Sequence, residues 1–264
     1  MARHLRLFAR LAAQDRACTL GYFHDWSESG ERIAGISRSI IDAAADLVPR
    51  GYVSLKAAAF HYDPVLVAAI VARAGERGVL AHFDSHEHAT ADATMACVRQ
   101  AAATGVAVGL TLPGRWRRSP ADVDLACQLG ARVRVVKGEW ADPGEPRMDK
   151  RRGFLGVIDR LAGRATEVAV ATHDPWLARE ALGRLQAAGS RCELELLNGL
   201  PRRALLAVAR EFSVPVRVYI PFGISWRPYA LGKAAENPRI LWWVLRDTVV
   251  GLAGRIRALS ARSG

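Results

Sequence analysis

Apolar positions along the chain follow two alternating periods. Short runs rich in Val, Ile and Leu, bounded by Gly, Pro or polar residues, predict strands. Longer segments rich in Ala, Leu and Arg, such as 64–78 and 175–190, place apolar residues at i, i+3, i+4 and i+7 and predict amphipathic helices. The clearest strands are expected at 52–58, 79–84, 106–112, 132–137, 167–172, 192–197 and 215–220.

The strict alternation of strands and helices predicts a parallel sheet. Units of roughly 25 to 35 residues suit a (βα)8 barrel, which needs about 250 residues. The eighth strand is expected at 19–23, and the alternative of a doubly wound sheet lacks a GxGxxG after its first strand. We therefore predict an α/β fold, a distorted TIM-type (βα)8 barrel forming a single domain over 1–264. Its lead-in of helix and strand is 1–45, and its basic tail is 247–264.

The charge balance permits an acidic partner without identifying one. The chain has 37 Lys and Arg residues against 26 Asp and Glu, a formal net charge of +11. Such a charge favours nucleic acid, anionic lipid or an acidic protein, but no nucleic-acid recognition motif occurs, and no nucleic-acid partner is expected. Only four basic residues are lysines, and Lys56, Lys137 and Lys233 lie at expected strand ends or on the last helix.

Cysteine spacing and hydropathy bear on location. The four cysteines lie far apart without a CxxC pair, so neither a zinc ribbon nor a dense disulfide framework is indicated. No apolar stretch is long enough to span a bilayer; the run 240–245 ends at Arg246. A cytoplasmic location is expected. The basic ends of the chain are interpreted as solvated tails, with peripheral contact to the inner face of a membrane as the alternative.

Polar residues gather where strands are expected to end, and barrel enzymes carry their chemistry there. Lys56 lies in the apolar segment VSLKAAAF and needs a partner, because burying an unpaired ammonium is very costly. Asp84 ends the next strand and is expected to lie close enough to pair with it. Arg134 and Lys137, followed by Gly138, suit an anionic group such as a phosphate or a reduced flavin.

Histidines near two strand ends raise a metal alternative. The segment HFDSHEH places His82, Asp84, His86 and His88 at alternate positions, which would share one face if the strand continued. A polar start of a loop is the preferred interpretation. In ATHDP, His173 either contacts a ligand or makes an ordinary hydrogen bond.

The last expected helix carries an aromatic residue, a cation and a carboxylate. Tyr229, Lys233 and Glu236 are spaced i, i+4 and i+7 and therefore share one helical face. This face either contacts substrate or is the solvent-exposed side of an amphipathic helix.

Taken in order, these segments resemble the proline dehydrogenase family of flavoenzymes from about Thr19 to Asp247. VSLKAAAF is similar to the family's first strand with its active-site lysine, and GLTLPGRWRRSPADV to the third strand and its exit. RVRVVKGEW is close to Arg-Leu-Val-Lys-Gly, and ATHDP to Ala-Thr-His-Asn. ELELLNGL and RVYIPFG resemble the next two strands, and SWRPYALGKAAEN resembles the final active-site helix.

The resemblance implies a barrel that binds FAD and oxidises proline to pyrroline-5-carboxylate by hydride transfer to flavin N5. A quinone or another acceptor would then take the electrons. The catalytic residues it implies are Lys56, Asp84, Tyr219 and Tyr229. The substrate-binding residues are Leu197, Lys233 and Glu236. The cofactor-binding residues are Arg134, Lys137, Gly138, Trp140, Thr172, His173 and Glu195.

Departures from the family pattern leave the substrate open. Pro113 replaces a glutamine and can donate no hydrogen bond, and Glu195 replaces another glutamine. Two adjacent arginines that clamp the proline carboxylate are Gly232 and Lys233 here, and a lysine is no substitute for a bidentate fork. One alternative is therefore a substrate without a free α-carboxylate: an ester, an amide or a carrier-bound prolyl group. The other is a barrel without flavin, acting as a binding protein or as a hydrolase with a metal on His82, Asp84, His86 and His173.

Overall fold

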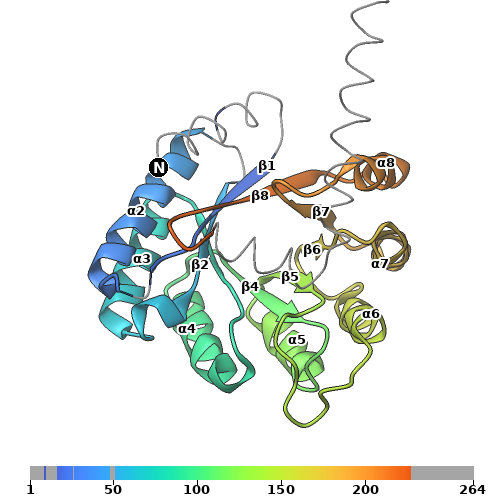
Figure 1. Cartoon of the computed structure of the whole chain (residues 1–264), viewed down its shortest axis with the longest axis horizontal. Coiled ribbons are helices and arrows are strands. Elements are labelled where there is room, and N and C mark those ends of the chain that lie inside the picture. Colours follow the sequence, from blue (N-terminus) through green and yellow to red (C-terminus); the bar gives the residue numbers. More distant parts are fainter. Residues whose placement is uncertain (1–8, 10–16, 26, 48–50, 227–264) are drawn as a thin grey trace, which may run out of the picture.

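A computed structural model describes residues 9, 17–25, 27–47 and 51–226. Parallel strands close into a barrel of eight, in which each strand pairs with the next along the chain and the first pairs with the last (Figure 1). The strands are β1 (Ala17–Tyr22), β2 (Tyr52–Leu55), β3 (Leu80–Phe83), β4 (Val108–Pro113), β5 (Arg132–Val136), β6 (Val168–Ala171), β7 (Cys192–Leu197) and β8 (Val216–Phe222). The predicted (βα)8 barrel is confirmed, and its expected eighth strand is β1.

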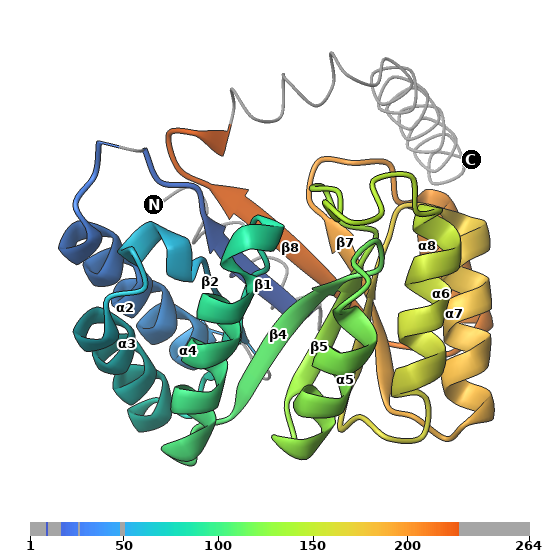
Figure 2. The ribbon, with the colours of Figure 1, turned by 90° about the horizontal axis from the view of Figure 1, so that it is seen from below.

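The helices lie around the outside of this barrel, as Figure 2 shows from the side. They are α2 (Gly30–Leu47), α3 (Pro64–Glu76), α4 (Ala91–Ala103), α5 (Ser119–Gln128), α6 (Lys150–Leu161), α7 (Pro175–Ala187) and α8 (Arg203–Glu211). Their inner faces are apolar and pack on the strands; Phe154, Ile158 and Leu161 of α6 are fully buried. Each such side chain contributes about 1.5–3 kcal/mol by its burial. Within the described residues, no helix combines the length and the hydropathy needed to span a membrane.

Several helices begin at an aspartate that caps them. Asp63 accepts hydrogen bonds from the backbone N–H groups of Val65 and Leu66, with Pro64 at the first helical position of α3. Asp174 caps α7 in the same way, ahead of Pro175. A carboxylate satisfies N–H groups that have no partner inside the helix, and proline has none to satisfy. At α3 and α7 the sequence therefore sets the residue at which the helix starts.

The predicted strand 52–58 was wrong in its second half. β2 ends at Leu55, and Lys56 precedes a short 3-10 helix, η1 (Ala57–Phe60). The N–H of His61, directly after η1, donates to Ala58 O. Lys56 therefore lies at the mouth of the barrel. β3 likewise ends at Phe83, and His88 begins a second 3-10 helix, η2 (His88–Thr90). His82, Asp84, His86 and His88 therefore do not share one face of a strand.

The barrel interior is polar. A TIM barrel is usually filled by branched aliphatic side chains. Here alternate residues of β5 and β7 are charged and buried, and so is Arg217 of β8. The His82 ring of β3 also lies inside, beside Gly109 of β4, where a Cβ would come within 2.5 Å of His82 Nδ1. The glycine makes room for this ring.

Candidate active site

A cavity of about 940 Å³ opens at the carboxyl ends of the strands. Its volume lies at the upper end of the range of about 300–1,000 Å³ typical of small-molecule sites. Every predicted site residue within the described part lines it: Lys56, Asp84, Arg134, Lys137, Gly138, Trp140, Thr172, His173, Glu195, Leu197 and Tyr219. Tyr229, Lys233 and Glu236 lie outside the described residues.

Lys56 is held at the inner wall of this cavity by three contacts. Its Nζ donates to Tyr22 O at 3.1 Å, lies 3.9 Å from Asp84 Oδ2 and lies 3.9 Å from the centre of the Phe23 ring. The pairing with Asp84 expected from the sequence is therefore present. Burial lowers the pKa of Lys56, the Asp84 carboxylate opposes this, and Arg134 adds to it.

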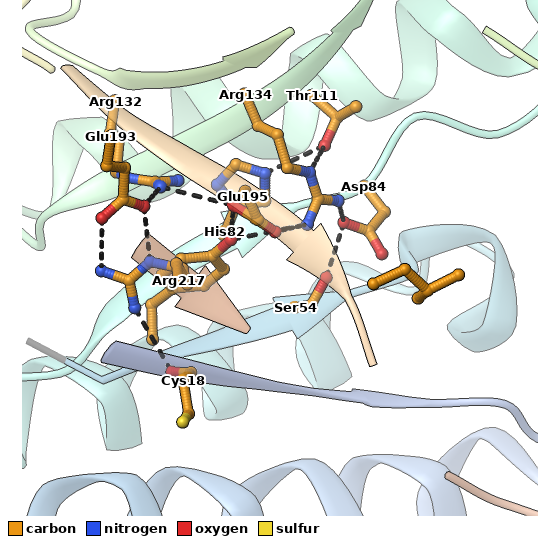
Figure 3. A network of polar contacts seen from close by, with 12 residues as sticks. Cys18, Ser54, His82, Asp84, Thr111, Arg132, Arg134, Glu193, Glu195 and Arg217 are labelled. Carbon is orange, nitrogen blue, oxygen red and sulfur yellow. Dashed lines mark hydrogen bonds and ion pairs between the residues drawn. The ribbon is translucent and has the colours of Figure 1, made fainter. Parts of the chain in front are cut away.

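Arg134 joins two carboxylates at the floor of the cavity (Figure 3). Its Nη2 binds Asp84 Oδ1, and its Nη1 lies 3.0 Å from Glu195 Oε1. Its Nε donates to Thr111 Oγ1 at 3.0 Å. Ser54 donates to the same Asp84 oxygen at 2.6 Å, which leaves Oδ2 directed toward Lys56. The donors of Arg134 are thus engaged inside the protein, and its role in holding a cofactor stays a prediction.

A second layer of ions lies deeper in the barrel. Arg132 and Arg217 both bind Glu193, and the Arg217 Nε lies 2.5 Å from Glu193 Oε1. The guanidinium carbons of Arg132 and Arg217 lie 4.6 and 4.7 Å from the centre of the Tyr52 ring, and the Tyr52 hydroxyl donates to Glu195 at 2.7 Å. Burial raises the pKa of Tyr52 to about 12. Tyr52 therefore connects the deeper layer to the floor of the cavity.

His173 is fixed by both of its ring nitrogens. Nδ1 donates to Pro201 O at 3.1 Å, and Nε2 accepts the Leu197 N–H at 2.9 Å. The nitrogens that a metal ligand would need are therefore engaged, and this histidine connects the ends of β6 and β7. His82 lies inside the barrel with Nε2 2.9 Å from Thr111 Oγ1. In the part of the chain that the structure describes, no three His, Cys, Asp or Glu residues are arranged to hold a metal ion, so the hydrolase alternative lacks its ligand set there.

We expect the protein to lose stability as the pH falls from 7 to 5.5. Burial, with Arg134 and Arg132 adding to it, holds the pKa of His82 well below its ordinary value, and burial also lowers the pKa values of His24, His86 and His173. The unfolded chain takes up protons near pH 6.5 where the folded chain does not, so the unfolding free energy rises with pH across this window. His82 alone contributes about 1.4 kcal/mol of the loss at pH 5.5.

Urea unfolding at the two pH values measures this effect. His82→Gln should reduce the difference between them, and His61→Asn, at an exposed position with φ 50°, should leave it as in the original chain. Equal differences in all three proteins would show that folding does not lower the pKa of His82.

One sector of the cavity was not expected from the sequence. Phe23, His24 and Asp25 follow β1, and Ser225 and Trp226 follow β8. The strand 19–23 was expected only as the eighth and least distinct strand, and no site residue was predicted at its exit. The rule that chemistry lies at the carboxyl ends of strands would have identified these positions once β1 was counted with the others.

Comparison with known sequences supports the resemblance. No family model matches the chain. Proline dehydrogenase 1 of Bacillus subtilis (strain 168) is 23% identical over 253 residues, which are 90% of this chain and 83% of the relative. Proline dehydrogenase of Deinococcus radiodurans is 27% identical over 191 residues, 69% of this chain and 61% of that protein. The similarity to proline dehydrogenases expected from the motifs is confirmed.

Solved structures of the same barrel give a consistent picture. Proline utilization A of Bdellovibrio bacteriovorus superposes with a TM-score of 0.71 at 14% identity, over 83% of this chain and 29% of that chain. The protein of the same name from Corynebacterium freiburgense gives 0.68 at 15% identity, over 93% and 31%. At these identities the likeness establishes the fold. The chain spans less than a third of either of these larger proteins.

Proposed function

We propose that the protein is an FAD-dependent oxidoreductase that oxidises the CH–NH bond of proline or a proline-like secondary amine to a cyclic imine, with a quinone or another acceptor taking the electrons. The observation that carries the proposal is the convergence of the predicted residues of the described part on one cavity at the carboxyl ends of the strands. The names of the sequence relatives support the same reaction.

The residues around the cavity fit a flavin nucleotide. Trp140, Val136 and Leu197 offer flat or apolar surfaces to a planar ring system. Lys137, whose side chain is 39% exposed, lies at the rim with Nζ 3.9 Å from Asp174, a carboxylate that Arg151 also binds. Such a group of cations suits a pyrophosphate. When bound, FAD supplies the acceptor for the hydride, and the protein supplies orientation and charge.

Three side chains at the inner wall would act on the amine. The Asp84 Oδ2 lines the cavity and can accept an N–H of the substrate, because its partner Oδ1 is engaged by Ser54 and Arg134. Lys56 Nζ lies 3.9 Å from this oxygen and faces the substrate's side of the carboxylate. Burial and Asp84 raise the pKa of Tyr219 well above its ordinary value, so its hydroxyl keeps its proton and serves as a donor.

The purified protein tests the proposal directly. We expect a yellow preparation with the visible spectrum of an oxidised flavin, which bleaches on anaerobic addition of a proline compound. L-Proline and L-prolinamide at millimolar concentration separate the two substrate alternatives, because only the first has a free carboxylate. A colourless protein that FAD does not restore, or a yellow one that neither compound bleaches, contradicts the proposed reaction.

Lys56→Met tests the inner wall in the same experiment. We expect the flavin to remain bound, because its apolar and cationic contacts lie elsewhere, and the rate of bleaching to fall by about 100-fold or more. Lys150→Met, which changes an exposed lysine at the start of α6, is the matched control and should bleach at the original rate. Unchanged bleaching by Lys56→Met would remove this lysine from the reaction.

A further inference from the structure

The charges enclosed by the barrel balance one another. The cations of the described inner network are Lys56, Arg132, Arg134 and Arg217. Its carboxylates are Asp84, Glu193, Glu195 and the more exposed Glu167, which lies 3.7 Å from Arg132 Nε. Each cation faces a carboxylate within 4 Å, and the number of cations equals the number of carboxylates. A ligand that enters the cavity therefore meets a floor without net charge.

Glu195 is the carboxylate on which this balance depends at the floor of the cavity. It lines the cavity, its side chain is 3% exposed, and it holds Arg134 at 3.0 Å and Arg132 at 3.5 Å. Burial raises the pKa of its carboxyl, but Arg134, Arg132 and Arg217 outweigh burial, and the net pKa is lowered. Glu195 is thus ionised, and with Asp84 it cancels the positive charge that Arg134 would otherwise present to a ligand.

We propose that Glu195 is a specificity-determining residue. By cancelling the charge of Arg134, it lowers the affinity of the cavity for anionic groups. The cavity then prefers a cyclic secondary amine whose carboxyl group is masked as an amide or ester. A free substrate carboxylate gains little at this floor, because both Arg134 and Lys56 already face protein carboxylates. The inference rests on the proposed function for the amine, whereas its electrostatic part depends only on the charges at the cavity floor.

Two carbocyclic probes isolate the charge. Cyclopentanecarboxylate and cyclopentanecarboxamide have nearly the same shape, differ by one charge and have no ring nitrogen to oxidise. Trp140 and Trp226 line the cavity, so quenching of tryptophan fluorescence reports the dissociation constants of both probes in the protein as purified. We expect Glu195→Gln to improve the binding of the carboxylate relative to the carboxamide by about tenfold, or about 1.4 kcal/mol, since Arg134 is left partly uncompensated.

Control variants separate this effect from a structural one. Glu195→Asp keeps the charge and should keep the original ratio. Glu139→Gln removes an exposed carboxylate of the cavity rim, which solvent screens, and should change the ratio less than twofold. Asp84→Asn removes the other carboxylate on Arg134 and should shift the ratio in the same direction as Glu195→Gln, so the inference can be tested even if one of the two variants does not fold.

An unchanged ratio in Glu195→Gln or in Asp84→Asn would overturn the inference, as would an equal shift in Glu139→Gln. These outcomes involve no flavin chemistry. A protein without a flavin spectrum would contradict the proposed function and leave the probe measurement intact, so the two failures are distinguishable.

Discussion

Arg134→Met should reduce the unfolding free energy by about 3–5 kcal/mol, which is a large part of the stability of an ordinary domain. The substitution keeps much of the side-chain volume but removes the cation between Asp84 and Glu195, whose side chains are 10% and 3% exposed. Each carboxylate then stays buried without its main partner. Urea unfolding followed by circular dichroism measures the loss.

Removing the two unpaired carboxylates as well shows whether the loss of stability comes from their charge or from lost packing. Arg134→Met combined with Asp84→Asn and Glu195→Gln should recover much of the loss, because no uncompensated carboxylate then remains at the cavity floor.

A surface arginine provides the matched control. Arg160 binds Asp124 through two nitrogens, at 3.0 and 2.6 Å, but its side chain is 52% exposed. Arg160→Met should cost less than about 1 kcal/mol, since water replaces the guanidinium at the carboxylate. Equal losses at the two sites would mean that the buried network contributes no more than a surface ion pair.

The architecture could be predicted from the sequence because each element follows a local rule. Strand runs and helix periods alternate, aspartates and prolines mark helix starts, and every expected strand is found in the barrel. The exit of β2 was the main error. VSLKAAAF is uniformly apolar apart from its lysine, and nothing local distinguishes the strand from the 3-10 turn that follows it at Ala57.

The polar interior was not predicted, although its pattern is visible in the sequence. Arg132 and Arg134, like Glu193 and Glu195, stand two apart in a strand and therefore share one face. The sequence alone indicated Arg134 and Glu195 as cofactor-binding residues, but it did not indicate the ion pairs that join Glu195 to Arg134 and Arg132. Which face of a strand points inward is decided by closure of the barrel, through contacts between residues such as Arg132 and Glu193 that are 61 positions apart.

Gly21→Ala, which adds one methyl group to the first strand, should lower the unfolding free energy strongly. Gly21 lies in β1, and a Cβ there would overlap the phenol oxygen and Cζ of Tyr219 on the neighbouring β8. The ring cannot shift without leaving the cavity wall and its position over Arg134, 5.2 Å from ring centroid to guanidinium carbon. We expect a loss of about 3 kcal/mol, measured by urea unfolding, because overpacked side chains in a closed barrel have little room to relax.

The same clash predicts a dependence between the two positions. Tyr219→Leu alone removes the ring and should cost about 2–4 kcal/mol by leaving a gap. The double variant with Gly21→Ala should cost at least about 1 kcal/mol less than the sum of the single losses, since the alanine methyl group then meets no ring. Gly35→Ala is the control: in α2 a Cβ would have no neighbour within 4 Å, and the change should stabilise the protein by about 0.5–1 kcal/mol. Additive losses at positions 21 and 219 would mean that the Tyr219 ring does not occupy the space beside Gly21 and does not form the wall of the cavity next to Asp84.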